Sequence, residues 1–207
     1  MPFDFETIRR RLRNRVATRQ SETGILRRAA VAAILRPLGT GPDADTEVLL
    51  IRRAERANDP WSGHMAFPGG HQDSADIDTR ATAMRETLEE VGLDLRPHDY
   101  LGELDELSAV ARGLRVPMSI APHVFSIAGV QLPDLSPNYE VAEAVWGSLG
   151  QMYRGELDTT KEWSFEGQTQ VVPAFNVGGH LVWGMTYLML RSLFQVLHEA
   201  KAEVGGT

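Results

Sequence analysis

The stretch Phe67–Leu93, FPGGHQDSADIDTRATAMRETLEEVGL, contains the features that decide the fold. It starts as the end of an apolar strand, turns through Pro-Gly-Gly, crosses a polar loop and continues as a helix. Glu86, Glu89 and Glu90 are spaced i, i+3 and i+4, so their side chains share one face of that helix. Like charges at this spacing repel each other, so the cluster indicates a bound cation. Mg²⁺ is the hard divalent ion that carboxylate oxygens suit best.

The residues around the three glutamates support a structured site. Arg85 can hydrogen-bond one carboxylate through its planar guanidinium and fix its orientation. Gly92 is typical of a helix C-terminus, and either Asp76 or Asp78 can cap the N-terminus. A solvated acidic face on a surface helix is the alternative, but it leaves Arg85, Gly92 and the upstream glycines unexplained.

The other face of the helix and the glycine turn are also informative. Ala81, Met84, Leu88 and Val91 follow a helical spacing and predict the side that packs on the core. Glycine allows the backbone to approach a ligand closely, so we expect the Gly70 carbonyl to serve as a further metal ligand.

The segment Arg85–Leu93, RETLEEVGL, resembles the second half of the Nudix box, R-E-U-x-E-E-x-G-U, where U is aliphatic. The usual first half, G-x5-E-x7, does not fit, because counting back from Arg85 reaches His71 and Ile77. Thr87 departs from the aliphatic position, and we expect this to matter little.

A variant of the box matches better. In the coenzyme A pyrophosphatase branch of the Nudix hydrolases, F-P-G-G is followed by a longer loop, an Asp-rich stretch and T-A-x-R-E. Phe67–Gly70, Asp73, Asp76 and Thr82–Glu86 match that variant in register. Trp183–Thr186, WGMT, resembles the W-G-x-T that opens the last helix in the same branch, so the resemblance extends over most of the chain.

The resemblance implies a fold and a reaction. The fold is α/β, the Nudix α/β/α sandwich, with a mixed β-sheet between the box helix and the C-terminal helix. The reaction is hydrolysis of a pyrophosphate linkage in a nucleoside diphosphate joined to another group. Mg²⁺ or Mn²⁺ would be held by Glu86, Glu89, Glu90 and Gly70, and Arg85 would hold a carboxylate in position.

The general base is left open between two glutamates. Glu89 in the box is one candidate, and a glutamate beyond the box is the other, because several Nudix enzymes use one. Glu140 is our choice for the second, and Glu143 is a weaker one. For both, an exposed strand glutamate without a catalytic role is the alternative.

Coenzyme A or an acyl-CoA is the leading substrate. Arg53, Trp61, His64 and Phe67 are the expected substrate contacts. The branch often has His where this chain has Trp61, and Gln or Glu where it has His64. These departures favour the alternatives of an NDP-sugar, ADP-ribose or a nucleoside triphosphate. For Trp61, a stacking residue in the pocket and a structural aromatic are both open. A non-catalytic nucleotide-sensing module is the alternative from another class, and such modules usually lose box carboxylates.

Composition bounds these hypotheses. The chain has 207 residues, and we expect one Nudix hydrolase domain over 1–207, with 1–25 as an N-terminal helical extension. The formal charge of −7 argues against a nucleic-acid partner, and the sequence has no apolar run of the roughly 20 residues that cross a membrane. The absence of cysteine suits a cytoplasmic protein. The six histidines are scattered along the sequence and give a zinc site little support. A homodimer is possible by analogy with the family.

Hydrophobic patterning predicts the remaining elements. Strands are expected at 29–35, 47–53, 100–107, 122–127 and 140–146, with a hairpin from 162–165 and 171–177. Helices are expected at 3–19 and 182–200, and 109–118 is expected to be a connection.

Overall fold

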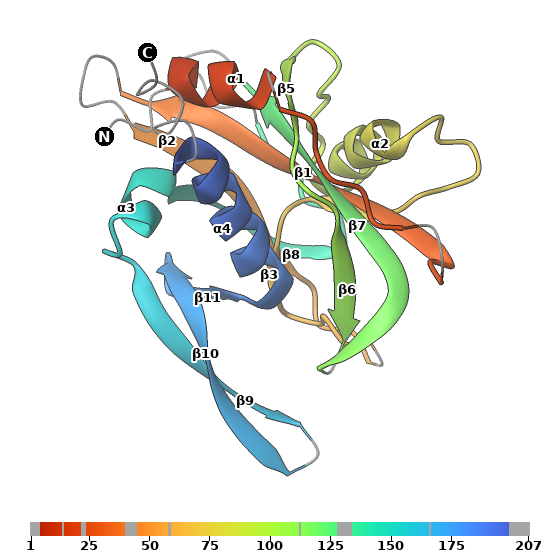
Figure 1. Ribbon diagram of the computed structural model, residues 1–207, viewed down its shortest axis with the longest axis vertical. Coiled ribbons are helices and arrows are strands. Elements are labelled where there is room, and N and C mark those ends of the chain that lie inside the picture. The colour runs from red at the N-terminus through yellow and green to blue at the C-terminus, as the bar shows by residue number, and fades with distance from the viewer. Residues whose placement is uncertain are drawn as a thin grey trace, which may run out of the picture.

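The computed structural model describes residues 5–13, 15–21, 24–39, 45–57, 59–111, 113–127, 134–165 and 167–198. Its helices are α1 (Phe5–Arg13), α2 (Thr79–Val91), α3 (Leu149–Tyr153) and α4 (Gly184–His198). Its strands are β1 (Arg27–Leu38), β2 (Asp45–Arg53), β3 (Met65–Ala66), β4 (Gly69–His71), β5 (Asp99–Glu103), β6 (Leu107–Ala111), β7 (Leu114–Ser126), β8 (Val141–Ser148), β9 (Asp158–Phe165), β10 (Gln168–Val177) and β11 (His180–Trp183). Figure 1 shows their arrangement.

The main sheet is organised around β1. Along the path β3-β2-β1-β7-β5, only the β1–β7 pair is parallel, and β4, β6 and β8 pair with β1, β7 and β2 in the antiparallel sense. One edge of β1 is shared by two partners, since Ala29 lies opposite His71 in β4 and Leu35 lies opposite Val48 in β2. The strand β2 therefore separates from β4 along β1. Strands β9, β10 and β11 form a separate antiparallel sheet.

The two faces of the main sheet are covered by different helices. In β1, Ala30, Ala32 and Ile34 belong to one apolar cluster together with residues of α2. Ala33 and Leu35 belong to the other, together with residues of α1 and α4. This alternation follows from the two-residue period of a strand. The predicted sandwich of a mixed sheet between the box helix and the C-terminal helix is therefore confirmed.

Most predicted elements lie within observed ones, with four differences. The predicted strand 100–107 is divided, since β5 ends at Glu103 and β6 begins at Leu107. The predicted connection 109–118 is instead covered by β6 and β7, which pair with each other. The N-terminal helix ends at Arg13 rather than Arg19, and the backbone N–H groups of Thr18 and Gln20 then donate to Asp105 and Glu106. The C-terminal helix begins at 184, because residues 180–183 pair with β10 as β11.

Some predictions lie outside the described residues. They include residues 1–4 and 199–207 of the predicted single domain, and residues 1–4 of the N-terminal extension. The single-domain assignment stays a prediction. Among the described helices, none is both long enough and apolar enough to cross a membrane.

The predicted apolar face of α2 is only partly correct. Of the four residues assigned to it, Val91 is buried and Met84 packs partly buried against the core, but Leu88 is 44% exposed. Thr82, Ala83, Thr87 and Glu90 are buried instead. The helix is rotated so that the Glu90 carboxylate reaches the backbone of β4. Thr87 is tolerated at this buried position because its hydroxyl donates to the Ala83 carbonyl at 2.7 Å.

A buried polar pair connects β7 to the start of α2. His123 is 2% exposed, and its Nδ1 and Nε2 lie 3.0 Å from the Tyr100 hydroxyl and 2.9 Å from the Thr79 hydroxyl. Burial lowers the pKa of His123 to about 4. The folded protein therefore holds this ring neutral at pH values where an unfolded histidine takes up a proton.

We predict that His123 makes the fold acid-sensitive. Because its folded pKa lies below its unfolded value, the stability from the neutral ring is present above about pH 6.5. As the pH falls to about 4, the free energy of unfolding decreases by about 3 kcal/mol, the amount that corresponds to the shift in the pKa of His123. Urea unfolding at intervals from pH 7 to pH 4 measures this, and His123→Gln should show a shallower decline. An equal decline in the variant would contradict the assignment.

Candidate active site

Local sequence sets the two ends of α2. Asp78 caps the N-terminus, since its carboxylate accepts from the backbone N–H of Ala81 at 2.7 Å. Gly92 ends the helix at φ 72°, a left-handed conformation that glycine adopts without a steric penalty. Both ends agree with the sequence, which had left Asp76 and Asp78 open for the cap. The box glutamates consequently lie in the second half of the helix.

Arg85 joins the helix to the loop before it. Its Nε and Nη2 donate to the two carboxylate oxygens of Asp76 at 3.1 and 2.9 Å, and Nη2 also donates to the His71 carbonyl at 3.0 Å. Its Nη1 donates to Glu86 at 2.8 Å and contacts Glu89 at 3.3 Å. These hydrogen bonds from Arg85 hold the pKa of Asp76 at about 2. Sequence analysis predicted a carboxylate partner for Arg85 but not the bidentate pair with Asp76.

Glu86 and Glu90 face the glycine turn. The backbone N–H of Gly69 donates to Glu90 at 2.8 Å, and the Glu90 side chain is buried, with its residue only 2% exposed. A Cβ at Gly70 would lie 2.5 Å from the carboxylate carbon of Glu86, so only glycine leaves room for that carboxylate. Burial raises the pKa of Glu86, and it raises the pKa of Glu90 to about 7.

These two carboxylates fit a divalent cation. Their raised pKa values mean that the surrounding groups do not fully compensate the negative charges of the half-buried Glu86 and the buried Glu90, and a hard cation with oxygen ligands would do so. Glu89 is different, because its side chain is 55% exposed and contacts Arg85. Within the described ranges, no three acidic or histidine side chains are grouped closely enough to hold a metal by themselves. A site built on Glu86 and Glu90 therefore needs other oxygens, such as the Gly70 carbonyl.

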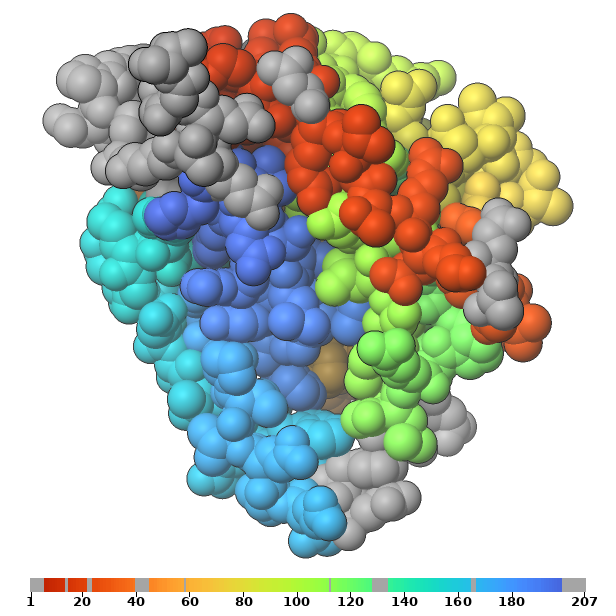
Figure 2. Space-filling model, viewed as in Figure 1, coloured from red at the N-terminus to blue at the C-terminus, as the bar shows by residue number. Residues whose placement is uncertain are grey.

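A cavity of about 590 Å³ opens beside these glutamates. It extends from α2 past the separation between β2 and β4 to α4. In Figure 2 a hollow lies between the blue surface of α4 and the green surface of β6 and β7. Of the residues predicted from sequence, the cavity is lined by Arg53, Trp61, His64, Phe67, Gly70, Glu86, Glu90 and Glu140. The predicted residues Arg85, Glu89 and Glu143 do not line it.

The aromatic lining residues are held by the protein itself. The indole N–H of Trp61 donates to the Val110 carbonyl at 3.2 Å, so one edge of the ring is fixed. The His64 ring lies 4.7 Å from the Trp183 ring, centroid to centroid. Phe67 is buried and packs within the core, so it shapes the wall more than it offers an exposed ring.

The second sequence motif reaches the same cavity. Trp183, Met185 and Thr186 all line it, although they lie almost a hundred residues after the box. The Thr186 hydroxyl donates to the Met65 carbonyl at 2.9 Å. This hydrogen bond ties the start of α4 to the strand that precedes the F-P-G-G turn, so both segments that carry the resemblance build one site.

The two candidate glutamates on and before β8 have different surroundings. Glu140 lines the cavity and pairs with Arg56 at 3.0 Å. Glu143 instead contacts Arg52 at 3.7 Å and His180 at 3.0 Å. The sequence analysis missed Arg56. Its position three residues after Arg53, a predicted substrate contact, was the available signal.

Comparison with known proteins places the chain in a family. The family profile of the NUDIX domain matches residues 26–166, which is more than half of the sequence. The chain belongs to the Nudix family. It is a Nudix hydrolase, and the family relationship makes it an enzyme that acts on a nucleotide-containing substrate.

Individual relatives agree with this assignment. The chain is 30% identical over 172 residues to the mitochondrial coenzyme A diphosphatase NUDT8 of Homo sapiens, covering 82% of this chain and 70% of that protein. It is 40% identical over 116 residues to an uncharacterized protein of Schizosaccharomyces pombe, covering 54% of this chain and about a third (35%) of that protein. A mutT/nudix family protein from Listeria innocua has the same fold, with TM-score 0.50 and 16% identity over 86% of this chain and 97% of that one.

We predict that the buried Glu90 carboxylate destabilises the metal-free Nudix fold. The pKa of Glu90 is higher in the folded than in the unfolded protein. The free energy of unfolding that is present below about pH 4.5 therefore decreases by about 3 kcal/mol as the pH rises through about 7. In EDTA at pH 8, Glu90→Gln should therefore raise the melting temperature, and at pH 4.5 it should leave it nearly unchanged. Differential scanning calorimetry at both pH values measures this.

Glu89→Gln is the matched control. The Glu89 side chain is exposed, so this substitution should change the melting temperature little at either pH. Mg²⁺ should then raise the wild-type melting temperature more than that of Glu90→Gln, since a ligand stabilises only the state that binds it. A Glu90→Gln variant that melts below the wild type at pH 8 in EDTA would refute the prediction.

Proposed function

We propose that this Nudix hydrolase cleaves the pyrophosphate of coenzyme A or an acyl-CoA with the help of Mg²⁺ or Mn²⁺. The products would be a phosphopantetheine, acylated or free, and adenosine 3′,5′-bisphosphate. One observation carries the proposal: the F-P-G-G and W-G-M-T segments, which carry the resemblance to the coenzyme A branch, line the same cavity as Glu86 and Glu90. The human relative named as a coenzyme A diphosphatase supports the same substrate.

The shape and lining of the cavity suit such a substrate. The cavity is lined by the carboxylates of Glu86 and Glu90 and by the cations Arg53 and Arg56. Its apolar lining includes Trp61, Met118, Ile120, Trp183, Met185 and Met189. Coenzyme A combines the same two characters, because a pyrophosphate is attached to a long and less polar arm. A mixed site of this kind binds the arm by apolar burial and orients the phosphates by charge.

The proposed roles of the box residues follow from their positions. Glu86, Glu90 and the Gly70 carbonyl would hold the metal, whereas Glu89, predicted from the sequence as a third carboxylate ligand, contacts Arg85 instead. When bound, a divalent cation neutralises phosphate charge and makes water a better nucleophile. Arg85 keeps the Glu86 carboxylate oriented by donating to it while Asp76 fixes the other side of the guanidinium.

Two glutamates remain candidates for the general base. Glu140 lies on the cavity wall, where its carboxylate could accept a proton from an attacking water. Arg56 pairs with Glu140 and lies on the same wall, so its guanidinium can also bind a substrate phosphate. Glu89 does not line the cavity and contacts Arg85, which favours Glu140 as the base.

An NDP-sugar, ADP-ribose or a nucleoside triphosphate is the second candidate substrate. The observation that favours it is the position of Trp61, whose ring lines the cavity where a base or sugar could stack. The sensor alternative has no such support, because Glu86, Glu89 and Glu90 are all present.

We predict that with Mg²⁺ the protein hydrolyses coenzyme A with a higher kcat/KM than ADP-ribose, NDP-sugars or nucleoside triphosphates. Mass spectrometry of the products on a nucleotide panel measures this. Glu86→Gln should lower the rate by about a hundred-fold to several-thousand-fold, since losing a ligand of a catalytic metal costs about 3–5 kcal/mol. Turnover of ADP-ribose or an NDP-sugar without turnover of coenzyme A would overturn the substrate proposal.

We predict that Glu140 and Glu143 differ in catalysis although they lie three residues apart. Glu140→Gln should lower kcat by about a hundred-fold or more with little change in KM, because a general base acts in the transition state. Glu143→Gln is the matched control and should leave kcat within about two-fold, because its carboxylate lies outside the cavity. Equal activity of the two variants would exclude Glu140 as the base and leave Glu89.

A further inference from the structure

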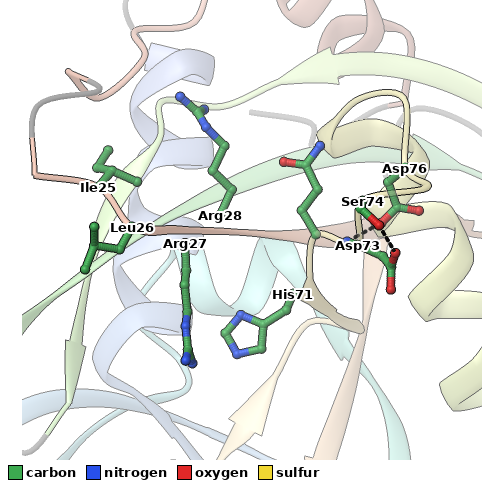
Figure 3. Close-up of a pocket in the computed structure, with 9 residues that line it drawn as sticks. Ile25, Leu26, Arg27, Arg28, His71, Asp73, Ser74 and Asp76 are labelled. Carbon is green, nitrogen blue, oxygen red and sulfur yellow. Dashed lines mark hydrogen bonds between the residues drawn. The ribbon is translucent and has the colours of Figure 1, made fainter.

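A second cavity, of about 850 Å³, adjoins the active-site cavity at the outer end of β1. His71 lines both cavities, so they meet at this residue. Figure 3 shows the second cavity with Arg27 and His71 on one side of β1 and Arg28 directed away from them. None of the roles proposed above uses Arg27.

Strand register connects Arg27 with the active site. Ala29 lies opposite His71 and Val31 lies opposite Gly69, and both Ala29 and Val31 line the active-site cavity. Because side chains alternate along a strand, Arg27 lies on the same face as these two residues. Arg27 is three residues from Ala30, the partner of Gly70, so its Cα is about 10 Å along the strand from the glycine turn.

The charge of Arg27 is available to a ligand. Its side chain is exposed, and within the described part of the chain no carboxylate forms an ion pair with it. Burial, and secondarily the charge of Arg27, lowers the pKa of His71, so the guanidinium acts on that ring. Arg28 differs from Arg27 because it faces the other side of the strand and pairs with Glu106 at 3.3 Å.

The acidic residues of this cavity are directed to other partners. The Asp76 carboxylate is bound by Arg85, as described above. The Asp73 carboxylate accepts from the Ser74 hydroxyl and from the backbone N–H of Ala75, both at 3.1 Å. In Figure 3 the Asp73 and Ser74 side chains lie on the far side of His71 from Arg27. Arg27 therefore remains a cation of this cavity that no carboxylate among the described residues pairs with.

We propose that Arg27, beside His71, forms an anion subsite for a phosphate of the substrate that is not part of the scissile pyrophosphate. The substrate class is then a nucleotide that carries an additional phosphomonoester on the ribose. The inference rests on the proposed function, since it assumes that the pyrophosphate lies at Glu86 and Glu90. An arginine outside the reacting centre binds a phosphate through charge-assisted hydrogen bonds. Such a contact contributes affinity and specificity, but the arginine takes no part in the chemical step.

The first test compares coenzyme A with dephospho-coenzyme A, which lacks the 3′-phosphate. The wild type should prefer coenzyme A by about tenfold in kcat/KM, a preference of the size that one charged contact supplies. Arg27→Gln should lose that preference through a higher KM for coenzyme A, with its kcat and the values for dephospho-coenzyme A unchanged. Arg28→Gln is the matched control and should keep the preference. Equal effects of Arg27→Gln on both compounds, or no preference in the wild type, would overturn the inference.

The second test needs no turnover and so separates this inference from the proposed function. Calorimetry measures binding of adenosine 3′,5′-bisphosphate and of AMP to the wild type and to Arg27→Gln. The variant should bind the bisphosphate about tenfold more weakly and AMP equally well. That result supports the subsite even if coenzyme A is not hydrolysed, in which case only the substrate proposal fails. Equal weakening for both nucleotides would refute the subsite even if coenzyme A is hydrolysed.

Discussion

The close approach between the acidic edge of α2 and the glycine turn of β4 is the constraint on which the rest of the site depends. Glu90 accepts a hydrogen bond from Gly69, and the Glu86 carboxylate occupies the space where a side chain at Gly70 would be. Both carboxylates are desolvated by this packing, and unpaired buried charge is costly. The arrangement is stable only if other groups hold it, and Arg85 with Asp76 does so from the loop side. A cation at the two glutamates would remove the remaining cost, which is why the same packing that strains the metal-free protein suits a metal-dependent enzyme.

The shared edge of β1 connects this local packing to the other face of the sheet. Along that edge, β4 is followed by β2, and between them the N–H of Ala32 bonds the Pro68 carbonyl at 2.8 Å. The cavity passes through this separation, so residues of α2 on one face of the sheet and of α4 on the other line one space. Thr186 fixes the far end by its hydrogen bond to Met65. Side chains from both faces of the sheet are therefore available to one ligand in this cavity.

The metal-free cavity has the same sign of charge as the whole protein, because Asp59, Glu86, Glu90 and Glu140 line it beside Arg53 and Arg56. The chain has a formal charge of −7, which repels a polyanionic nucleotide at long range. Arg53 and Arg56 line the cavity, and Arg27 lies where it opens outward. Screening at physiological salt limits the repulsion to about 8 Å, so local cations decide binding once the substrate is close. Under the proposed function, a few arginines and the metal would therefore bind the phosphates against the net charge of the protein.

Features that depend on neighbours in the sequence were predictable. The caps Asp78 and Gly92, the partnership of Arg85 with a carboxylate, and the strands of the main sheet follow from short-range hydrogen bonds and from the period of the backbone. The resemblance extended this to the sandwich and to the reaction class, which the family match confirms. The sequence also contained the three box glutamates, but it presented them as equivalent members of one helix face.

Only the tertiary structure distinguished among them. It buries Glu90 and leaves Glu89 and Leu88 exposed, because the rotation of α2 is set by its contact with β4 rather than by the most apolar stripe of its sequence. It pairs Arg56 with Glu140 across 84 residues and brings Thr186 to Met65 across 121. Such pairings depend on how distant strands and helices pack against each other, and the periodicity and spacing of residues do not determine that packing. The sequence by itself determined the local elements and the family chemistry, and the packing of distant segments decided which charged groups face the substrate.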